Sequence, residues 1–474
     1  MKKIVTNPYL PNFEYIPDAE PHVFNERVYI YGSHDRFNGN NFCLNDYVTW
    51  SAPVDDLSDW RYEGVIWKKS DDPTTNGKRV FYAPDVCQGP DGKYYLYYCP
   101  VQGITSGSFV INCAVADNPA GPFKFHGNVD LRKWNKSYLP FDPAVFVEDG
   151  RVYLYYGTAM FYPLLDVRSK SIKGGAVVEL DPKDMLTVID GPVLTVPTMK
   201  NDVNNEYGIH AFFEASSMRK FKGRYYFIYS SQAGHELCYC IGESPMGPFK
   251  RGGTIVSNGD IGLGEHVDSK TAVDFTGNTH GSMVEANGRY YIFFHRQTNK
   301  CQFSRQSIAE EVFIEEDGSI KQVERTSQGL YGKPLPGKGE YFASICCGLR
   351  AKEGNRFYGI FKWGHNKEPY LTQHGRDREE NPNQYIKNFN DGCSVTYKYF
   401  DLRETKSFGI EVNSSFAQGK LTMQYGNKEA IQEIDLKKEM KVIKFPVKKG
   451  GEKDKVTFIY EGKGSLDLTK LFLK

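Results

Sequence analysis

One short pattern, a polar turn followed by apolar and aromatic positions, recurs five times in the first 300 residues of the chain. Three of the copies open with Asp-Gly or Asn-Gly, and all continue into runs such as Tyr-Tyr-Leu-Tyr-Tyr. Asp-Gly and Asn-Gly supply the positive φ angles of a tight hairpin, and β-branched and aromatic residues favour strands. The copies span residues 25–32, 91–98, 149–156, 222–229 and 287–294. The pattern therefore predicts a β-hairpin repeated five times.

The spacing of the copies predicts how the hairpins are arranged. The second residues of successive copies are 66, 58, 73 and 65 positions apart, which leaves room for about four strands with their loops. Long amphipathic helical patterns are nearly absent, so helical and horseshoe solenoids are excluded. We predict an all-β fold in which residues 1–330 form a five-bladed β-propeller.

The pattern changes in the last third of the chain. Around residues 326–339, Ser, Gly, Pro and Lys predominate, which is typical of a linker. Residues 340–474 then alternate short strand-like runs with turns, for example at 394–400 and 455–460, as a β-sandwich does. We predict a second domain over residues 340–474, a β-sandwich of the jelly-roll type.

A polar residue precedes each hairpin, seven to nine positions before the second residue of the turn. The five residues are Asp18, Asp85, Asp142, Glu214 and His280. The innermost strand of every propeller blade lines the central channel, so equivalent positions converge there. One acidic residue at a strand start usually caps a turn, but five in register indicate a site. Crowded carboxyls have pKa values that are pushed apart, as acid and base chemistry requires.

These residues resemble glycoside hydrolase family 43, the five-bladed propeller enzymes that include α-L-arabinofuranosidases, β-xylosidases and arabinanases. The resemblance covers roughly residues 5–330 and is carried by segments 17–21, 29–35, 82–85, 141–143, 213–215 and 280–282. In that family the first-blade Asp is the general base, the third-blade Asp orients and tunes the acid, and the fourth-blade Glu is the general acid. The resemblance therefore implies that Asp18 is the base, Asp142 the tuning residue and Glu214 the acid.

Inversion at a sugar carbon needs one carboxylate to activate water and an opposed carboxylic acid to protonate the leaving oxygen. Room for the water sets the distance between the two carboxyls at roughly 6.5 to 9.5 Å, and we expect this distance for Asp18 and Glu214. A neighbouring Asp142 is expected to raise the pKa of Glu214 by like-charge repulsion, which keeps it protonated near neutral pH.

The resemblance also implies a structural calcium ion near the channel centre, which His280 contacts through water. The alternative is that His280 only forms a hydrogen bond to Asp142 or to the backbone. No cofactor is expected for the chemistry itself.

Further residues are candidates for substrate binding. Tyr82 and Phe141 flank Asp85 and Asp142 in the sequence, where aromatic faces can wall a sugar subsite, with core packing as the alternative. Asp85 is placed in the same group. Arg296 and Arg305 are candidates to hold sugar hydroxyls or the acid, with an ordinary surface position as the alternative.

The composition narrows the partners. There are 59 basic and 58 acidic residues, a net charge of +1, so nothing favours nucleic acid or an anionic membrane. A neutral oligosaccharide is the expected partner, and the oligomeric state stays open. The ten cysteines form no CxxC pairs, which favours buried, reduced thiols. Because no apolar run has the length of a signal peptide or a membrane span, we expect a cytoplasmic protein.

The C-terminal segment resembles family 6 carbohydrate-binding modules at residues 385–392, 397–401 and 462–467. Such modules need exposed aromatic residues, and only Trp363 and several tyrosines are of a suitable type. We favour a structural role for this domain, with sugar binding as the alternative.

Together, the residues and the resemblance predict an inverting exo-glycosidase that removes terminal α-L-arabinofuranosyl or β-D-xylosyl units from plant-type oligosaccharides. A blind central pocket suits terminal sugars. An endo-arabinanase or a galactofuranosidase of the same family stays open, because loops shape the pocket. A non-catalytic sugar-binding propeller would lack the base or the acid, whereas all three carboxyl positions are present here.

Overall fold

The regular secondary structure is almost entirely β-strand in the computed structural model, which describes residues 4–75, 77–101, 109–159, 172–359, 367–379 and 383–474. The helical segments in these ranges are 3₁₀ turns of three residues each: η1 (Lys69–Asp71), η2 (Arg132–Trp134), η3 (Gly208–His210), η4 (Gly329–Tyr331) and η5 (Ala343–Ile345). None of the described helices has the length and apolar character needed to span a bilayer. The predicted all-β class is confirmed.

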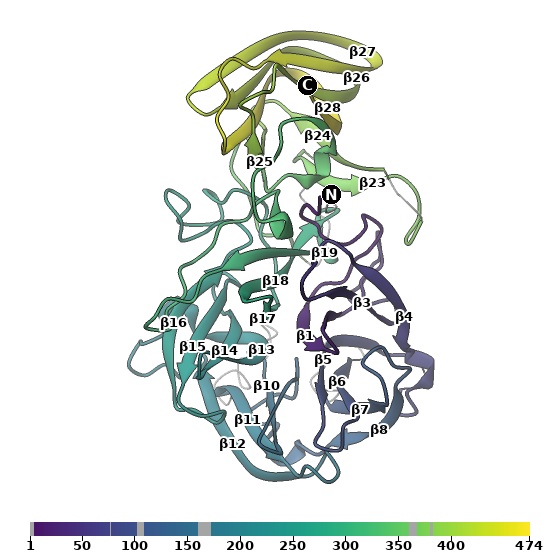
Figure 1. Cartoon of the computed structure of the whole chain (residues 1–474), viewed down its shortest axis with the longest axis vertical. Helices are drawn as coiled ribbons and strands as arrows, with labels where there is room; N and C mark the ends of the chain where they lie inside the picture. The colour runs from purple at the N-terminus through teal and green to yellow at the C-terminus, as the bar shows by residue number, and fades with distance from the viewer. Residues whose placement is uncertain (1–3, 76, 102–108, 160–171, 360–366, 380–382) are drawn as a thin grey trace.

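Five antiparallel sheets form the N-terminal part of the chain and follow one another in sequence (Figure 1). Their strands are β1 (Glu20–Phe24), β2 (Arg27–Tyr31), β3 (Tyr47–Pro53) and β4 (Arg61–Trp67) in the first; β5 (Val80–Gln88), β6 (Tyr94–Val101), β7 (Ile111–Ala116) and β8 (Lys124–Val129) in the second; β9 (Ala144–Glu148), β10 (Arg151–Tyr156), β11 (Gly174–Leu180) and β12 (Val188–Pro197) in the third; β13 (Phe212–Phe221), β14 (Arg224–Ser231), β15 (Leu237–Gly242) and β16 (Phe249–Val256) in the fourth; and β17 (Ser282–Ala286), β18 (Arg289–Thr298) and β19 (Cys301–Val312) in the fifth. The predicted five-bladed propeller is confirmed.

The first strands of the five sheets close into a ring. Strands β1, β5, β9, β13 and β17 contact one another in this order, and β17 also contacts β1. A parallel bridge between Ala19 and Gly281 joins the first and last sheets. The N-terminal segment reinforces the closure, since the side-chain amide of Asn7 donates to the carbonyl of Ala309 at 3.1 Å. Equivalent positions of the five repeats therefore face one channel.

Repeated sequence features serve the same structural purpose in different blades. The turn of the third hairpin has positive φ at Asp149 (50°) and Gly150 (74°), the geometry that an Asp-Gly hairpin adopts. Tyrosines of the repeated pattern reach into the next blade: the hydroxyl of Tyr31 donates to Pro119 O at 2.8 Å and that of Tyr155 to Pro245 O at 2.6 Å. The aromatic runs thus hold neighbouring blades together.

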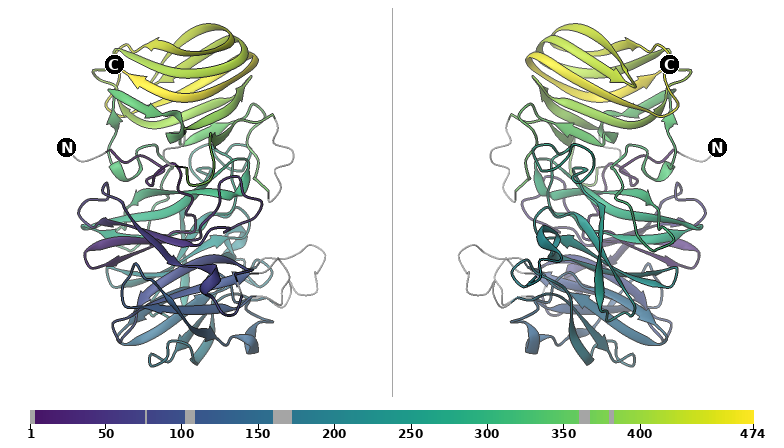
Figure 2. Two further views of the ribbon diagram at one scale, coloured as in Figure 1. Left: turned by 90° about the vertical axis from the view of Figure 1, so that its right-hand side faces the viewer. Right: turned by 90° about the vertical axis from the view of Figure 1, so that its left-hand side faces the viewer.

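The second domain is a strand-rich unit with its own hydrophobic core. Its strands are β20 (Leu335–Pro336), β21 (Gly339–Phe342), β22 (Gly348–Arg350), β23 (Tyr370–Gln373), β24 (Gln384–Asn390), β25 (Ser394–Asp401), β26 (Ser407–Tyr425), β27 (Lys428–Pro446) and β28 (Asp454–Leu473). The last three are long and curl over the core (Figure 2). The predicted sandwich is confirmed, and its first strand already lies within the predicted linker. Trp363 lies outside the described residues, and sugar binding by this domain stays a prediction.

The second domain lies next to the fifth blade (Figure 1), and the two domains share buried polar contacts. The guanidinium of Arg296, which is 1% exposed, donates to Ser344 O at 2.7 Å. The ammonium of Lys398 pairs with Asp260 at 2.8 Å. The structure therefore places Arg296 at the domain contact and does not bring it to the channel carboxyls. All ten cysteines are buried, as predicted.

Candidate active site

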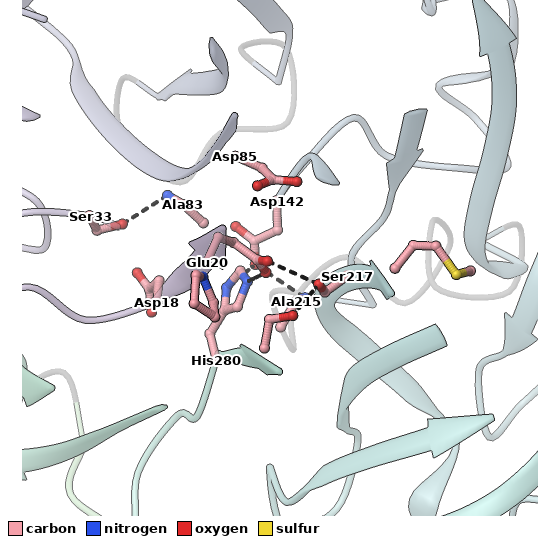
Figure 3. Close-up of polar contacts among 12 residues, drawn as sticks. Asp18, Glu20, Ser33, Ala83, Asp85, Asp142, Ala215, Ser217 and His280 are labelled. Carbon is pink, nitrogen blue, oxygen red and sulfur yellow. Dashed lines mark hydrogen bonds and ion pairs between the residues drawn. The ribbon is translucent and has the colours of Figure 1, made fainter. Parts of the chain in front are cut away.

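The polar residues that open the five repeats meet at the channel. Figure 3 shows Asp18, Asp85, Asp142 and His280 around one centre, together with Glu20. The backbone is kinked where the carboxyls emerge, because Asp18 (φ 59°) and Asp142 (φ 44°) occupy the left-handed region. Non-glycine residues rarely adopt this conformation, and it is concentrated at functional sites.

Asp18 lies against a buried positive charge. Its Oδ1 accepts a hydrogen bond from Nη1 of Arg305 at 2.8 Å. Arg305 is in turn held by both oxygens of Asp35, with Nε to Oδ2 at 2.8 Å and Nη2 to Oδ1 at 3.0 Å. Burial is the largest single effect and would raise the pKa of Asp18. The charge of Arg305, together with His295, His280 and a hydrogen bond from Ser33, outweighs burial, and the pKa lies below its usual value. A carboxyl in this setting is ionised near neutral pH and is able to accept a proton.

His295 orients the same aspartate through its backbone. The amide N–H of Asp18 donates to Nδ1 of His295 at 3.2 Å, and Nε2 of the ring contacts Asn278 O at 2.8 Å. Nδ1 must therefore be unprotonated while Nε2 carries the hydrogen. Burial lowers the pKa of His295 to about 3, which agrees with a neutral ring of this tautomer. Neither Asp35 nor His295 was singled out from the sequence.

Different groups surround Glu214. It is partly exposed, and its Oε2 accepts a hydrogen bond from the Thr158 hydroxyl at 3.3 Å. Burial and then the charge of Asp142 raise its pKa well above the usual value, against the opposing effect of His280. A carboxyl in this setting keeps its proton near neutral pH and can donate it.

Asp142 links the acid to the channel centre. Its Oδ2 accepts the backbone N–H of Ala215, the residue after Glu214, at 3.2 Å and lies 3.5 Å from Nδ1 of His280 (Figure 3). Burial raises the pKa of Asp142 although the imidazole opposes this. The pKa of His280 is raised well above its usual value, because Asp142 and Glu20 outweigh the effect of burial.

Below these residues lies a further polar cluster. The carboxylate of Glu20 accepts a hydrogen bond from the guanidinium of Arg219 at 2.6 Å, and its other oxygen lies 3.6 Å from Nε2 of His280. Ligand atoms of Glu20, His22 and Asp85 lie within 4.8 Å of one another, as a metal site requires. The guanidinium of Arg219 already contacts Nε2 of His22 at 3.3 Å, so this arginine supplies a positive charge to the cluster.

Asp85 is completely buried and joins three blades. Its Oδ1 is 2.5 Å from Nε2 of His22 and its Oδ2 accepts the N–H of Val145 at 2.8 Å. Both oxygens are therefore engaged by protein groups. This arrangement suits a residue that holds the first strands in place.

Aromatic rings wall the Asp18 side of the site. Tyr82 and Phe141 lie 5.4 Å apart, and Tyr82 also contacts Phe42 at 6.1 Å. Phe42, which the sequence did not single out, covers the guanidinium of Arg305 at 5.1 Å. Phe141 is 3% exposed, so Phe42 and Tyr82 are the rings of this group with accessible surface.

Comparison with known proteins places the propeller in a family. The family described as Glycosyl hydrolases family 43 matches residues 5–320. A xylosidase/arabinosidase of Thermoclostridium stercorarium is 50% identical over 420 residues, which covers 87% of this chain and 86% of that protein. A xylosidase/arabinosidase of Bacteroides ovatus is 32% identical and covers 60% of this chain and 87% of that protein.

Solved structures resemble both parts of the molecule. A family 43 arabinoxylan arabinofuranohydrolase from Bacillus subtilis matches 99% of this chain and 97% of its own, with a TM-score of 0.53 and 21% identity. This likeness supports the fold alone. A β-xylosidase/α-arabinofuranosidase from a compost metagenome, solved with xylotriose in a calcium-free form, matches 67% of this chain and 97% of its own, with a TM-score of 0.52 and 27% identity.

Proposed function

Because the chain belongs to glycosyl hydrolases family 43, we propose that it is an inverting exo-glycosidase that removes terminal α-L-arabinofuranosyl or β-D-xylosyl units from plant-type oligosaccharides. The observation that carries this proposal is the contrast between the two carboxyls, because Asp18 is held ionised by Arg305 and Glu214 is held protonated. The relatives named xylosidase/arabinosidase support the choice of sugars.

In the proposed reaction, Asp18 takes a proton from a water molecule while the oxygen of that water attacks the anomeric carbon. Glu214 gives its proton to the glycosidic oxygen, whose bond to that carbon breaks. The products are the free sugar of inverted configuration and the shortened alcohol. Asp18 ends the cycle protonated and Glu214 ionised, so exchange with solvent restores both. The required distance of roughly 6.5 to 9.5 Å between the two carboxyls stays a prediction.

The surrounding residues keep the two carboxyls in these states. Arg305 stabilises the carboxylate of Asp18 and fixes its direction, while His295 holds its backbone. Asp142 disfavours a negative charge on Glu214, and its carboxylate accepts a hydrogen bond from the backbone N–H of the next residue, Ala215. Tyr82 and Phe42 offer ring faces for the terminal sugar on the side of Asp18.

A calcium ion near His280 belongs to this proposal. Nε2 of His280 and Oε1 of Glu20 are buried and have no hydrogen-bond partner among the described residues, which leaves polar atoms for a ligand beside this pair. Calcium prefers oxygen ligands, so the carboxylate of Glu20 would hold it directly and the imidazole through water. The ion would add positive charge at the channel centre. Metal analysis of dialysed protein tests this point.

Hydrolysis of a panel of p-nitrophenyl glycosides tests the main proposal. The panel contains the α-L-arabinofuranoside, the β-D-xyloside and the β-D-galactofuranoside, with Asp18→Asn as the control variant. We expect release from the arabinofuranoside or the xyloside and no release by the variant. Nuclear magnetic resonance of the first-formed sugar would show the inverted anomer. No release from any of the three substrates, together with cleavage inside linear arabinan, would contradict the exo-acting assignment.

A further inference from the structure

The second domain places one partly exposed aromatic ring against the fourth blade, which carries Glu214. Phe357 belongs to the segment that follows β22, and 41% of it is exposed. Its ring lies 5.5 Å from that of His235, and His235 stands edge-on to Phe213 at 4.5 Å and 79°. Phe213 directly precedes Glu214 on β13. Three rings therefore form a row that begins at the residue next to Glu214 in β13.

The backbone that carries Phe357 is anchored to the propeller. A parallel bridge joins Phe357 to Thr276, and the N–H of Tyr358 donates to Thr276 O at 2.8 Å. Tyr358 stacks on Phe275 at 4.7 Å and 2°, and its carbonyl accepts a hydrogen bond from Gln302 at 2.6 Å. The backbone position of the exposed Phe357 is thus fixed by its buried neighbour Tyr358.

The ring group is uncharged and suited to a sugar face. Burial lowers the pKa of His235 to about 4, so its imidazole is neutral near neutral pH. Aromatic faces bind the apolar faces of sugar rings through dispersion and hydrophobic contact. A single exposed aromatic residue needs no explanation by itself, but a fixed ring that connects through two others to the residue next to Glu214 does.

The position of these three rings relative to Glu214 indicates which sugar they would bind. The acid protonates the oxygen of the leaving group, so the leaving sugar lies on the side of Glu214 and the terminal sugar on the side of Asp18. We propose that Phe357, supplied by the second domain, is a specificity-determining residue that binds the first sugar of the leaving group of a neutral oligosaccharide. This inference rests on the proposed function, since it takes Glu214 as the acid.

The test compares Phe357→Ala with two matched variants. Phe342→Ala is the control, because Phe342 is 39% exposed on β21 of the same domain. Phe357→Tyr keeps the ring and should restore the wild-type behaviour. The readouts are kcat/KM for xylotriose and arabinotriose, and inhibition by free xylose or arabinose, which needs only the terminal-sugar subsite.

We expect Phe357→Ala to lower kcat/KM for the trisaccharide about 3- to 10-fold, the range of an aromatic contact, with unchanged inhibition by the free sugar. Wild-type kcat/KM in this variant, or an equal loss in both readouts, would overturn the proposal. Calorimetric binding of the trisaccharide to Glu214→Gln, with and without Phe357→Ala, tests the binding role of Phe357 separately from the proposed catalytic function. Weaker binding in the double variant upholds the role of Phe357 even if the wild-type protein releases no sugar, whereas equal binding overturns it.

Discussion

Asp18 and Glu214 occupy equivalent places in the first and fourth repeats, and the regions around them differ in the sign of the nearest charge. Asp18 faces the guanidinium of Arg305, itself clamped by Asp35. Glu214 faces a hydroxyl group and the negative charge of Asp142. Burial acts on both carboxyls in the same direction, since it disfavours the charged form.

The difference shows how one repeated backbone produces both an acid and a base. Burial raises the pKa of each carboxyl, and the neighbouring charge then decides the outcome: the pKa of Asp18 is lowered and that of Glu214 is raised. Pairs of titratable groups whose surroundings push their pKa values apart are typical of acid and base assignments. The comparison can be tested from either side.

The largest effect is expected from removing the base. Asp18→Asn keeps the shape of the side chain but cannot accept a proton from water, so kcat should fall about 10³- to 10⁴-fold. The loss should be equal on a trisaccharide and on the p-nitrophenyl glycoside, because both need an activated water. Steady-state kinetics measure it, and circular dichroism checks the fold. A rate near that of the wild type would exclude Asp18 as the base.

Removing the acid should have an effect that depends on the leaving group. Glu214→Gln should lower kcat on a trisaccharide about 10²- to 10³-fold, because its alkoxide leaves poorly without a proton. The p-nitrophenyl glycoside should lose much less, since nitrophenolate is a stable leaving anion. The ratio of the two rates measures the contrast with Asp18→Asn. Equal losses on both substrates would remove the distinction between acid and base.

Removing the positive charge beside Asp18 should shift the acidic limb of the pH profile. The Arg305→Gln/Asp35→Asn variant removes the positive charge that lowers the pKa of Asp18. The second substitution is included because Asp35 would otherwise keep a carboxylate without its cationic partner. The base works only when ionised, and activity is lost as pH falls through its pKa, so the limb of kcat/KM should move up by about one unit or more.

Asp35→Asn alone is the control for this variant, because it retains Arg305 beside Asp18. Its acidic limb should stay close to that of the wild type. If the double variant also kept the wild-type limb, Arg305 would not be what lowers the pKa of Asp18.

The smallest effect is expected on the basic limb. Asp142→Asn removes the like charge that raises the pKa of Glu214. The acid works only when protonated, and activity is lost as pH rises through its pKa, so this limb should move to lower pH by about half a unit to one unit. Thr158→Val should move it the opposite way, because the Thr158 hydroxyl lowers the same pKa. Shifts of the same sign in both variants would contradict this account.

Several features of the site could be predicted from the sequence because they depend on local patterns. Asp-Gly and Asn-Gly turns and alternating strand residues define the hairpins, and a nearly constant offset from each turn places Asp18, Asp142 and Glu214 on the channel. Arg296 shows the limit of this reasoning. It lies on a strand of the fifth blade like Arg305, but it points into the domain contact.

The sequence by itself determined the repeat, the hairpin register and the residues that open each blade, since these follow from the period of strands and the conformations that turns demand. Only the tertiary structure decided which carboxyl is ionised, because the partners of Asp18 lie far from it along the chain: Arg305 is 287 positions away, and Asp35 is bound to Arg305 across 270. It also decided that Phe357 of the second domain stands beside His235. Charge and dispersion act through space over a few ångströms, and no local pattern records which distant residues the fold brings within that range.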